Sequence, residues 1–210
     1  MSSEEAQPRR LTRAETKART RAQLLDAAAQ VFARKGFAGA SVDDIAAQAG
    51  FTTGALYSHF SSKEEVFIEL LASRSRHRLV EAVEIVADAG RSLDETRSAM
   101  SRLVADVADH DTDFALLQAE FWLYAIRRPE FQQHLAGQFR ANRDALTAVL
   151  AARAEKRGEG GERPFEELST VLLALFQGLV QLRRTDPELV PDSLYGEASS
   201  WLFTGLAARR

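Results

Sequence analysis

The stretch S-V-D-D-I-A-A-Q-A-G-F-T-T-G-A-L-Y-S-H-F, residues 41–60, decides the fold of the N-terminal part of this chain. Ser41 is followed three positions later by an acid, the pattern of a helix N-terminus, and Gly50 is placed to end that short helix. After only Phe51, Thr52 is predicted to cap a second short helix. Two short helices joined by a tight glycine turn form a helix-turn-helix, whose second helix enters the major groove of DNA.

The second of these helices predicts which residues read base edges. Leu56 and Phe60 are spaced i, i+4 and are expected to face the core. The outward surface then carries small hydroxyl residues and a glycine that permits close approach, and we predict Thr53, Gly54 and Ser58 as base readers.

A second set of polar residues is predicted to hold phosphate oxygens through hydroxyl, imidazole, ammonium and free backbone N–H groups at helix N-termini or flanks. These residues are Ser41, Thr52, Tyr57, His59 and Lys63. The alternative is an ordinary surface helix with a core of Leu56 and Phe60, which does not require this arrangement of polar groups.

Helical patterns continue on both sides of this stretch. A first helix is predicted from about Thr16 to Lys35, with Gly36 at its end and Phe37 folding back onto it. Ser62 and Glu65 have the spacing of a further capping box, which opens a longer helix.

The stretch L-L-D-A-A-A-Q-V-F-A-R-K-G-F-A-G-A-S-V-D-D-I-A-A-Q-A-G-F-T-T-G-A-L-Y-S-H-F-S-S-K-E-E-V-F, residues 24–67, closely resembles the DNA-binding domain of the tetracycline-repressor (TetR) family. The resemblance includes the helix–Gly–aromatic step, S-V-D-D-I-A, L-Y-x-H-F and S-K-E-E. It implies a homodimer, a palindromic operator, and repression relieved by a ligand in the C-terminal domain. Thr53 stands where many relatives carry a basic or other polar residue, so no operator sequence is implied.

Charge is distributed unevenly along the 210 residues, whose net charge is −3. Residues 9–63 hold nine Lys or Arg against four acids, so an anionic partner would be attracted there. We predict a flexible basic arm over residues 1–15, with Arg9, Arg10 and Arg13 reaching a neighbouring groove or the DNA backbone. The alternative for this arm is a solvated charge run.

The rest of the chain favours an all-α fold with about nine helices. After the arm, we predict a three-helix helix-turn-helix domain over residues 16–63. A helical ligand-binding and dimerisation domain is predicted over residues 64–210. Helices are predicted at about 93–109, 112–127, 129–156, 165–185 and 192–208. The segment Lys156–Pro164 is expected to be a flexible loop.

Large apolar residues in the second domain predict either an interlocked core or a pocket for a largely apolar small-molecule effector. The predicted lining residues are Leu103, Val107, Phe114, Gln118, Phe121, Trp122 and Phe139. The helix at 165–185 is apolar nearly all the way round and needs cover on two sides, either within a monomer or in a homodimer. The predicted dimer interface is Leu172, Phe176, Leu179, Tyr195, Trp201, Leu202 and Leu206.

Composition argues against other classes of protein. There is no cysteine for a disulfide, a thiolate metal site or a thiol nucleophile. His59, His77, His110 and His134 lack metal-ligand spacing, and the acids of residues 109–113 are interpreted as helix caps, so no metal and no cofactor is predicted.

No catalytic motif is evident, so an enzyme is not expected. The alternative to a regulator is a helical ligand-binding or scaffolding protein with an unused helix-turn-helix.

No leader is expected at the N-terminus. The apolar run Val171–Leu182 is interrupted by Gln177 and is too short for a membrane span. A cytoplasmic location is therefore predicted.

Overall fold

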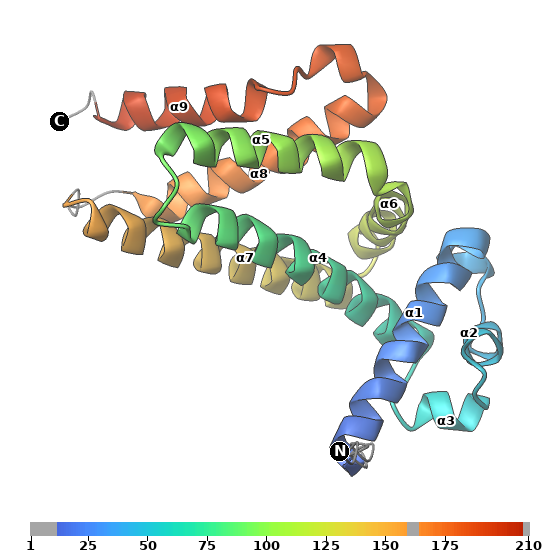
Figure 1. Cartoon of the computed structure of the whole chain (residues 1–210). Coiled ribbons are helices and arrows are strands. Elements are labelled where there is room, and N and C mark those ends of the chain that lie inside the picture. The colour runs from blue at the N-terminus through green and yellow to red at the C-terminus, as the bar shows by residue number, and fades with distance from the viewer. Residues whose placement is uncertain (1–11, 159–163, 208–210) are drawn as a thin grey trace, which may run out of the picture. The chain divides into compact units, whose positions relative to one another are not determined.

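The computed structural model describes residues 12–158 and 164–207, and every regular element in this part of the chain is helical (Figure 1). The all-α prediction is therefore confirmed. The elements are α1 (Arg13–Gly39), α2 (Val42–Ala49), α3 (Thr53–Tyr57), α4 (Lys63–Ala87), α5 (Leu93–His110), α6 (Thr112–Ile126), α7 (Pro129–Lys156), α8 (Phe165–Thr185), a short 3-10 turn (Pro187–Leu189) and α9 (Leu194–Ala207). The predicted bounds of α5 to α9 agree with these to within about three residues.

The chain divides into two compact units, and the division falls inside α4, between Leu71 and Ala72. The sequence predicts the division between residues 63 and 64, close to the start of α4. The first turns of α4 belong to the N-terminal unit because Val66, Phe67 and Leu70 are buried there. Helical periodicity marks where a helix starts but not where the core that it packs against ends.

The start of α1 shortens the predicted basic arm. Thr12 caps the helix through a reciprocal capping box with Glu15, so Arg13 lies in the first helical turn. Arg9 and Arg10 lie outside the described residues. At its other end, α1 changes course at Gly36, whose φ of +68° is strained for any residue with a side chain.

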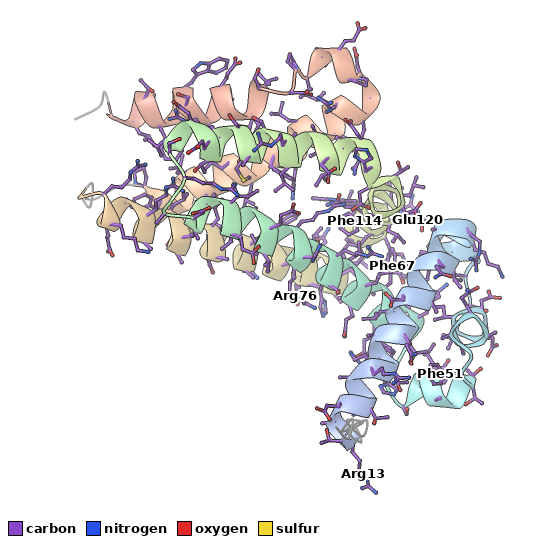
Figure 2. All side chains as sticks on the ribbon, viewed as in Figure 1. Arg13, Phe51, Phe67, Arg76, Phe114 and Glu120 are labelled. Atoms are coloured by element: carbon purple, nitrogen blue, oxygen red, sulfur yellow. The ribbon has the colours of Figure 1, made fainter. Side chains whose placement is uncertain are left out.

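A buried aromatic cluster holds the N-terminal unit together. After Gly36, Phe37 folds back as predicted and stacks on Phe67 of α4 at a centroid distance of 4.5 Å. Phe67 also packs edge to face on Phe32 of α1, with ring centres 5.1 Å apart. Phe67 is labelled in Figure 2. Such offset and edge-to-face pairs add to the stabilisation that burial provides.

Capping at the start of α4 differs from the predicted box. The Ser62 hydroxyl accepts from the Glu65 N–H, as expected, but the Glu65 carboxylate accepts from both the N–H and the hydroxyl of Ser61. These hydrogen bonds lower the pKa of Glu65. The spacing of Ser62 and Glu65 therefore predicted the start of α4 correctly. The return hydrogen bond from the Glu65 carboxylate goes to Ser61 instead of Ser62.

The C-terminal unit is a helical bundle in which α5 packs against both α8 and α9, and α7 packs against α8 (Figure 1). Arginine side chains join its helix ends. Arg153 of α7 donates to the carbonyls of Val86 and Arg91 and to the Thr96 hydroxyl. Arg183 of α8 donates to the carboxylates of Asp109 and Asp192.

Helix α8 is the one described helix that is long and apolar enough to cross a membrane by length and composition alone. Its first turn carries Glu166 and Glu167 and its last turn Arg183 and Arg184. Its apolar residues include Leu168, which is buried in the bundle core. A core helix of a soluble protein meets the same criteria, so this composition does not indicate a membrane protein.

Candidate functional site

The helix-turn-helix forms as the sequence predicts. Ser41 caps α2 through a reciprocal box with Asp44, and Gly50 ends α2 in the left-handed conformation (φ +73°). Thr52 caps α3, its hydroxyl accepting from the Ala55 N–H at 3.1 Å. Leu56 and Phe60 are fully buried, as their i, i+4 spacing predicted.

The outer face of α3 carries the predicted base readers. Gly54 and Ser58 are exposed, and a Cβ added at Gly54 would come within 3.9 Å only of the Thr52 hydroxyl, so the chain itself does not require glycine there. Thr53 is partly buried because its hydroxyl donates to the Asp43 carboxylate at 2.5 Å. This bond fixes the Thr53 side chain against α2.

The predicted phosphate contacts divide into two groups. Ser41 and Thr52 are caps, and Tyr57 is 54% exposed at the end of α3, so these three hydroxyl residues lie at the helix-turn-helix surface. His59 is different: its Nδ1 is buried, with no hydrogen-bond partner among the described residues. Burial lowers the pKa of His59, and the charges of Lys17 and Arg21 lower it further, which favours a neutral imidazole at pH 7.

Lys63 has a structural role that sequence reasoning missed. Its Nζ donates to the carbonyl oxygens of Phe37 (2.7 Å) and Ala40 (2.8 Å). It also lies 4.4 Å from the centre of the Phe37 ring, a cation–π distance. Two of the three ammonium protons are thus used to hold the end of α1, and at most one is left for a phosphate.

We predict that Lys63→Met lowers the free energy of unfolding of the N-terminal unit by about 1–3 kcal/mol, because two carbonyls lose a charged donor. Urea unfolding followed by circular dichroism measures this. Lys35→Met is the matched control: Lys35 is half exposed and pairs with Asp44 at the surface, so a smaller change is expected. An unchanged unfolding midpoint in Lys63→Met, with weaker and less salt-sensitive DNA binding, would contradict the structural role.

A cavity of about 780 Å³ lies within the C-terminal unit and is lined by residues of α4 to α9. This volume suits a small organic molecule. Of the predicted lining residues, Val107, Phe114, Gln118 and Trp122 face the cavity. Figure 2 labels Phe114 near the start of α6.

Three predicted lining residues do not face the cavity. Leu103 is buried in the bundle core, and Phe121 packs edge to face on Phe131 at 6.3 Å. Phe139 lies behind Trp122, with ring centres 5.8 Å apart. A helical pattern identified these side chains as inward-facing, but it did not distinguish those that fill the core from those that border an empty volume.

Sequence reasoning identified the polar lining residue Gln118 but missed the charged residues of the lining. Among the described residues, the lining holds no Asp or Glu and five arginines, which are Arg78, Arg97, Arg153, Arg157 and Arg184. A signal was present in the sequence: Arg183 and Arg184 directly follow the apolar run Val171–Leu182, and a charge that is buried beside such a run needs a partner. The sequence predicts a pocket for a largely apolar effector. Apolar side chains do line the cavity, but the five arginines were not part of that prediction.

The predicted dimer interface needs correction. Leu172, Leu179 and Tyr195 are buried within the C-terminal unit itself, and Leu172, Phe176 and Tyr195 line the cavity. Leu202 and Leu206 are partly buried. Of the seven predicted residues, Trp201 is the one with a largely exposed side chain, at 64%.

The acidic segment between α5 and α6 has structural partners. Asp109 pairs with Arg183, and Asp111 caps α6 by accepting from the Phe114 N–H. Asp111 also forms an ion pair with Arg78. These contacts support the interpretation of the segment as a helix junction.

Comparison with known proteins agrees with this architecture. Residues 24–70 match the family described as "Bacterial regulatory proteins, tetR family". The HTH-type transcriptional regulator TtgR of Pseudomonas putida is 30% identical over 208 residues, which cover 89% of this chain and 90% of TtgR. The HTH-type transcriptional repressor NicS of Pseudomonas putida is 32% identical over 59% of this chain and 50% of NicS.

The fold is likewise shared with solved structures. Salmonella enterica GusR superimposes with a TM-score of 0.69 at 24% sequence identity, covering 94% of this chain and 98% of GusR. Because the match to TtgR extends through both units, it is not confined to the helix-turn-helix. The chain therefore belongs to the TetR family of bacterial regulatory proteins, and it is a helix-turn-helix transcriptional regulator rather than an enzyme.

Proposed function

We propose that this regulator represses transcription by binding a palindromic operator as a homodimer, and that it leaves the operator when a small molecule fills the cavity of the C-terminal unit. The observation that carries this proposal is the pairing, in one chain, of a helix-turn-helix whose outer face is polar with a cavity of about 780 Å³ in the C-terminal unit. The name of NicS, a repressor, supports repression as the direction of the effect. A cytoplasmic location follows from this function.

The proposed dimer face is a stripe of exposed residues along α8. Val171, Ala174, Gly178 and Leu182 recur at helical spacing and are all exposed. On α9, Trp201 is exposed in the same way. Small residues at the centre of such a stripe let two helices approach closely, and a large ring beside them gives each copy an apolar anchor.

Helix α4 provides the proposed link between ligand and DNA. Its first turns bury Phe67 and Leu70 in the N-terminal unit, and its later turns carry Leu79, Ala82 and Val86 to the cavity wall. A ligand that binds more tightly to one position of α4 shifts the population toward that position. In a dimer, such a shift of α4 changes the distance between the two recognition helices, which then no longer matches the distance between successive major grooves.

Selection of bound duplexes from a random DNA pool at near-physiological salt tests the proposed function. We expect enrichment of a palindrome whose half-sites are about one helical turn apart, or a multiple of it. Enrichment of a single half-site would contradict the dimer. No enrichment by the folded, ligand-free protein would contradict operator binding and favour a helical ligand-binding protein.

Substitution of Thr53 is predicted to change which operator is preferred. Thr53→Val retains the one methyl group of threonine and replaces the hydroxyl, which anchors the side chain to Asp43, with a second methyl group. We expect a shift in the enriched bases at one position of each half-site, with a discrimination change of about 1–3 kcal/mol there. Tyr57→Phe serves as the control, because a lost phosphate contact weakens binding to all sequences alike. An equal loss on every sequence in Thr53→Val would contradict its role in base reading.

A further inference from the structure

We infer that the effector is an amphipathic anion, with an apolar body and one carboxylate-like head group that is held by Arg184 and Arg78. This inference rests on the proposed function and names the chemistry of its ligand. The lining contains five arginines and no acidic residue, so the cavity attracts a negative charge that the described lining does not supply.

Arg184 has donor capacity that its own surroundings leave unused. Its Nη2 donates to the carbonyls of Val107 (2.8 Å) and Asp111 (3.0 Å), and its Nε donates to the carbonyl of Ala108 (3.3 Å). No described residue accepts from its Nη1. The guanidinium is thus fixed in place by the end of α5 and still has a free pair of N–H groups at the cavity.

Arg78 adds a second positive charge at the same end of the cavity. It forms an ion pair with the Asp111 carboxylate and lies 4.0 Å from the centre of the Phe114 ring. In the described part of the chain, Asp111 is the one carboxylate that interacts with these two guanidinium groups, so one positive charge remains unbalanced there. Burial lowers the pKa of Arg184 and the nearby charge of Arg78 lowers it further, while the Asp111 carboxylate opposes both effects.

The other arginines of the lining are less suited to hold a head group. Arg153 uses its two terminal nitrogens on the Val86 and Arg91 carbonyls and the Thr96 hydroxyl. Arg97 pairs with Asp94, and Arg157 is exposed. The free donors and the unbalanced charge therefore coincide at Arg184.

The rest of the cavity favours an apolar body attached to this head group. Leu146, Leu172, Phe176 and Val180 provide apolar walls, with Trp122 among them. A wholly apolar ligand would bury the Arg184 donors without an acceptor, which is costly. A carboxylate accepts two parallel N–H bonds from a guanidinium, the geometry that arginine recognises best.

Tryptophan fluorescence tests the inference without DNA. The chain has two tryptophans, so Trp201→Phe leaves Trp122 as a reporter inside the cavity. Decanoate, decanol and decylamine, titrated into this variant below their micelle concentrations, differ only in the head group. We expect decanoate to bind at least about 10-fold more tightly than the other two, as one charge-assisted hydrogen-bonded pair provides.

Two substitutions localise the head group. Arg184→Gln is expected to reduce the preference for decanoate over decanol to less than about 3-fold. Arg157→Gln, which removes another lining arginine, is the matched control and should retain the full preference. Since Arg184 also holds backbone carbonyls, Arg78→Gln is a second variant, and circular dichroism verifies the fold of each.

Equal binding of decanoate and decanol, or a preference that survives in both Arg184→Gln and Arg78→Gln, would overturn the inference. The binding assay contains no DNA, so its result is independent of operator recognition. Decanoate that binds with the expected preference but does not release the selected operator would count against the proposed release mechanism and leave the head-group assignment standing.

Discussion

A Gly178→Glu variant is expected to be monomeric and to bind a two-half-site operator roughly 10²–10⁴-fold more weakly than the parent chain, because binding of the second half-site is no longer intramolecular. Gly178 lies in the middle of the proposed dimer stripe, between Ala174 and Leu182. Gly178 is exposed, and a Cβ built on it meets no atom of another segment within 4 Å, so the bundle leaves room for a side chain to start there. In a closely packed dimer, two glutamates would instead be forced together at the interface.

Analytical ultracentrifugation measures the oligomeric state, and titration with the selected duplex measures affinity. Gly137→Glu is the matched control, since Gly137 lies in α7, also has no atom within 4 Å of a built Cβ, and is outside the stripe. It should remain dimeric with unchanged DNA affinity. If Gly178→Glu sediments as a dimer, the α8 face is not the interface.

A Phe67→Ala variant is expected to lose about 3–5 kcal/mol of stability in the N-terminal unit and with it operator binding. Phe67 is fully buried and packs against both Phe32 and Phe37, so truncation leaves a cavity between α1 and the first turns of α4. Because a domain of this size is stabilised by only a small margin, this loss unfolds a large fraction of the helix-turn-helix.

Chemical unfolding monitored by circular dichroism should show a separate early transition for the N-terminal unit in Phe67→Ala. Ligand binding near Trp122 should be retained, since that residue belongs to the C-terminal unit. Val80→Ala, on an exposed position of the same helix, is the control and should change stability by less than about 0.5 kcal/mol. A single unfolding transition at the parental midpoint would contradict this account.

Local sequence determined the helix-turn-helix and most helix bounds. Ser41, Thr52 and Ser92 cap their helices through bonds that span three residues, and Gly50 takes up a left-handed conformation that few other residues adopt. These interactions depend only on neighbours in the chain. They can be predicted from the sequence because no distant segment is needed to form them.

Other features were decided by the tertiary structure alone. An all-round apolar helix such as α8 does not encode which side faces its own core. The sequence therefore predicts Leu172 and Phe176 at an interface, whereas in the structure they border the cavity of the C-terminal unit. Lys63 meets carbonyls that lie more than twenty residues earlier in the chain. Residues from six helices, α4 to α9, line the cavity and bring its five arginines together. The cavity leaves no periodic pattern in the sequence, because its position depends on how these helices pack.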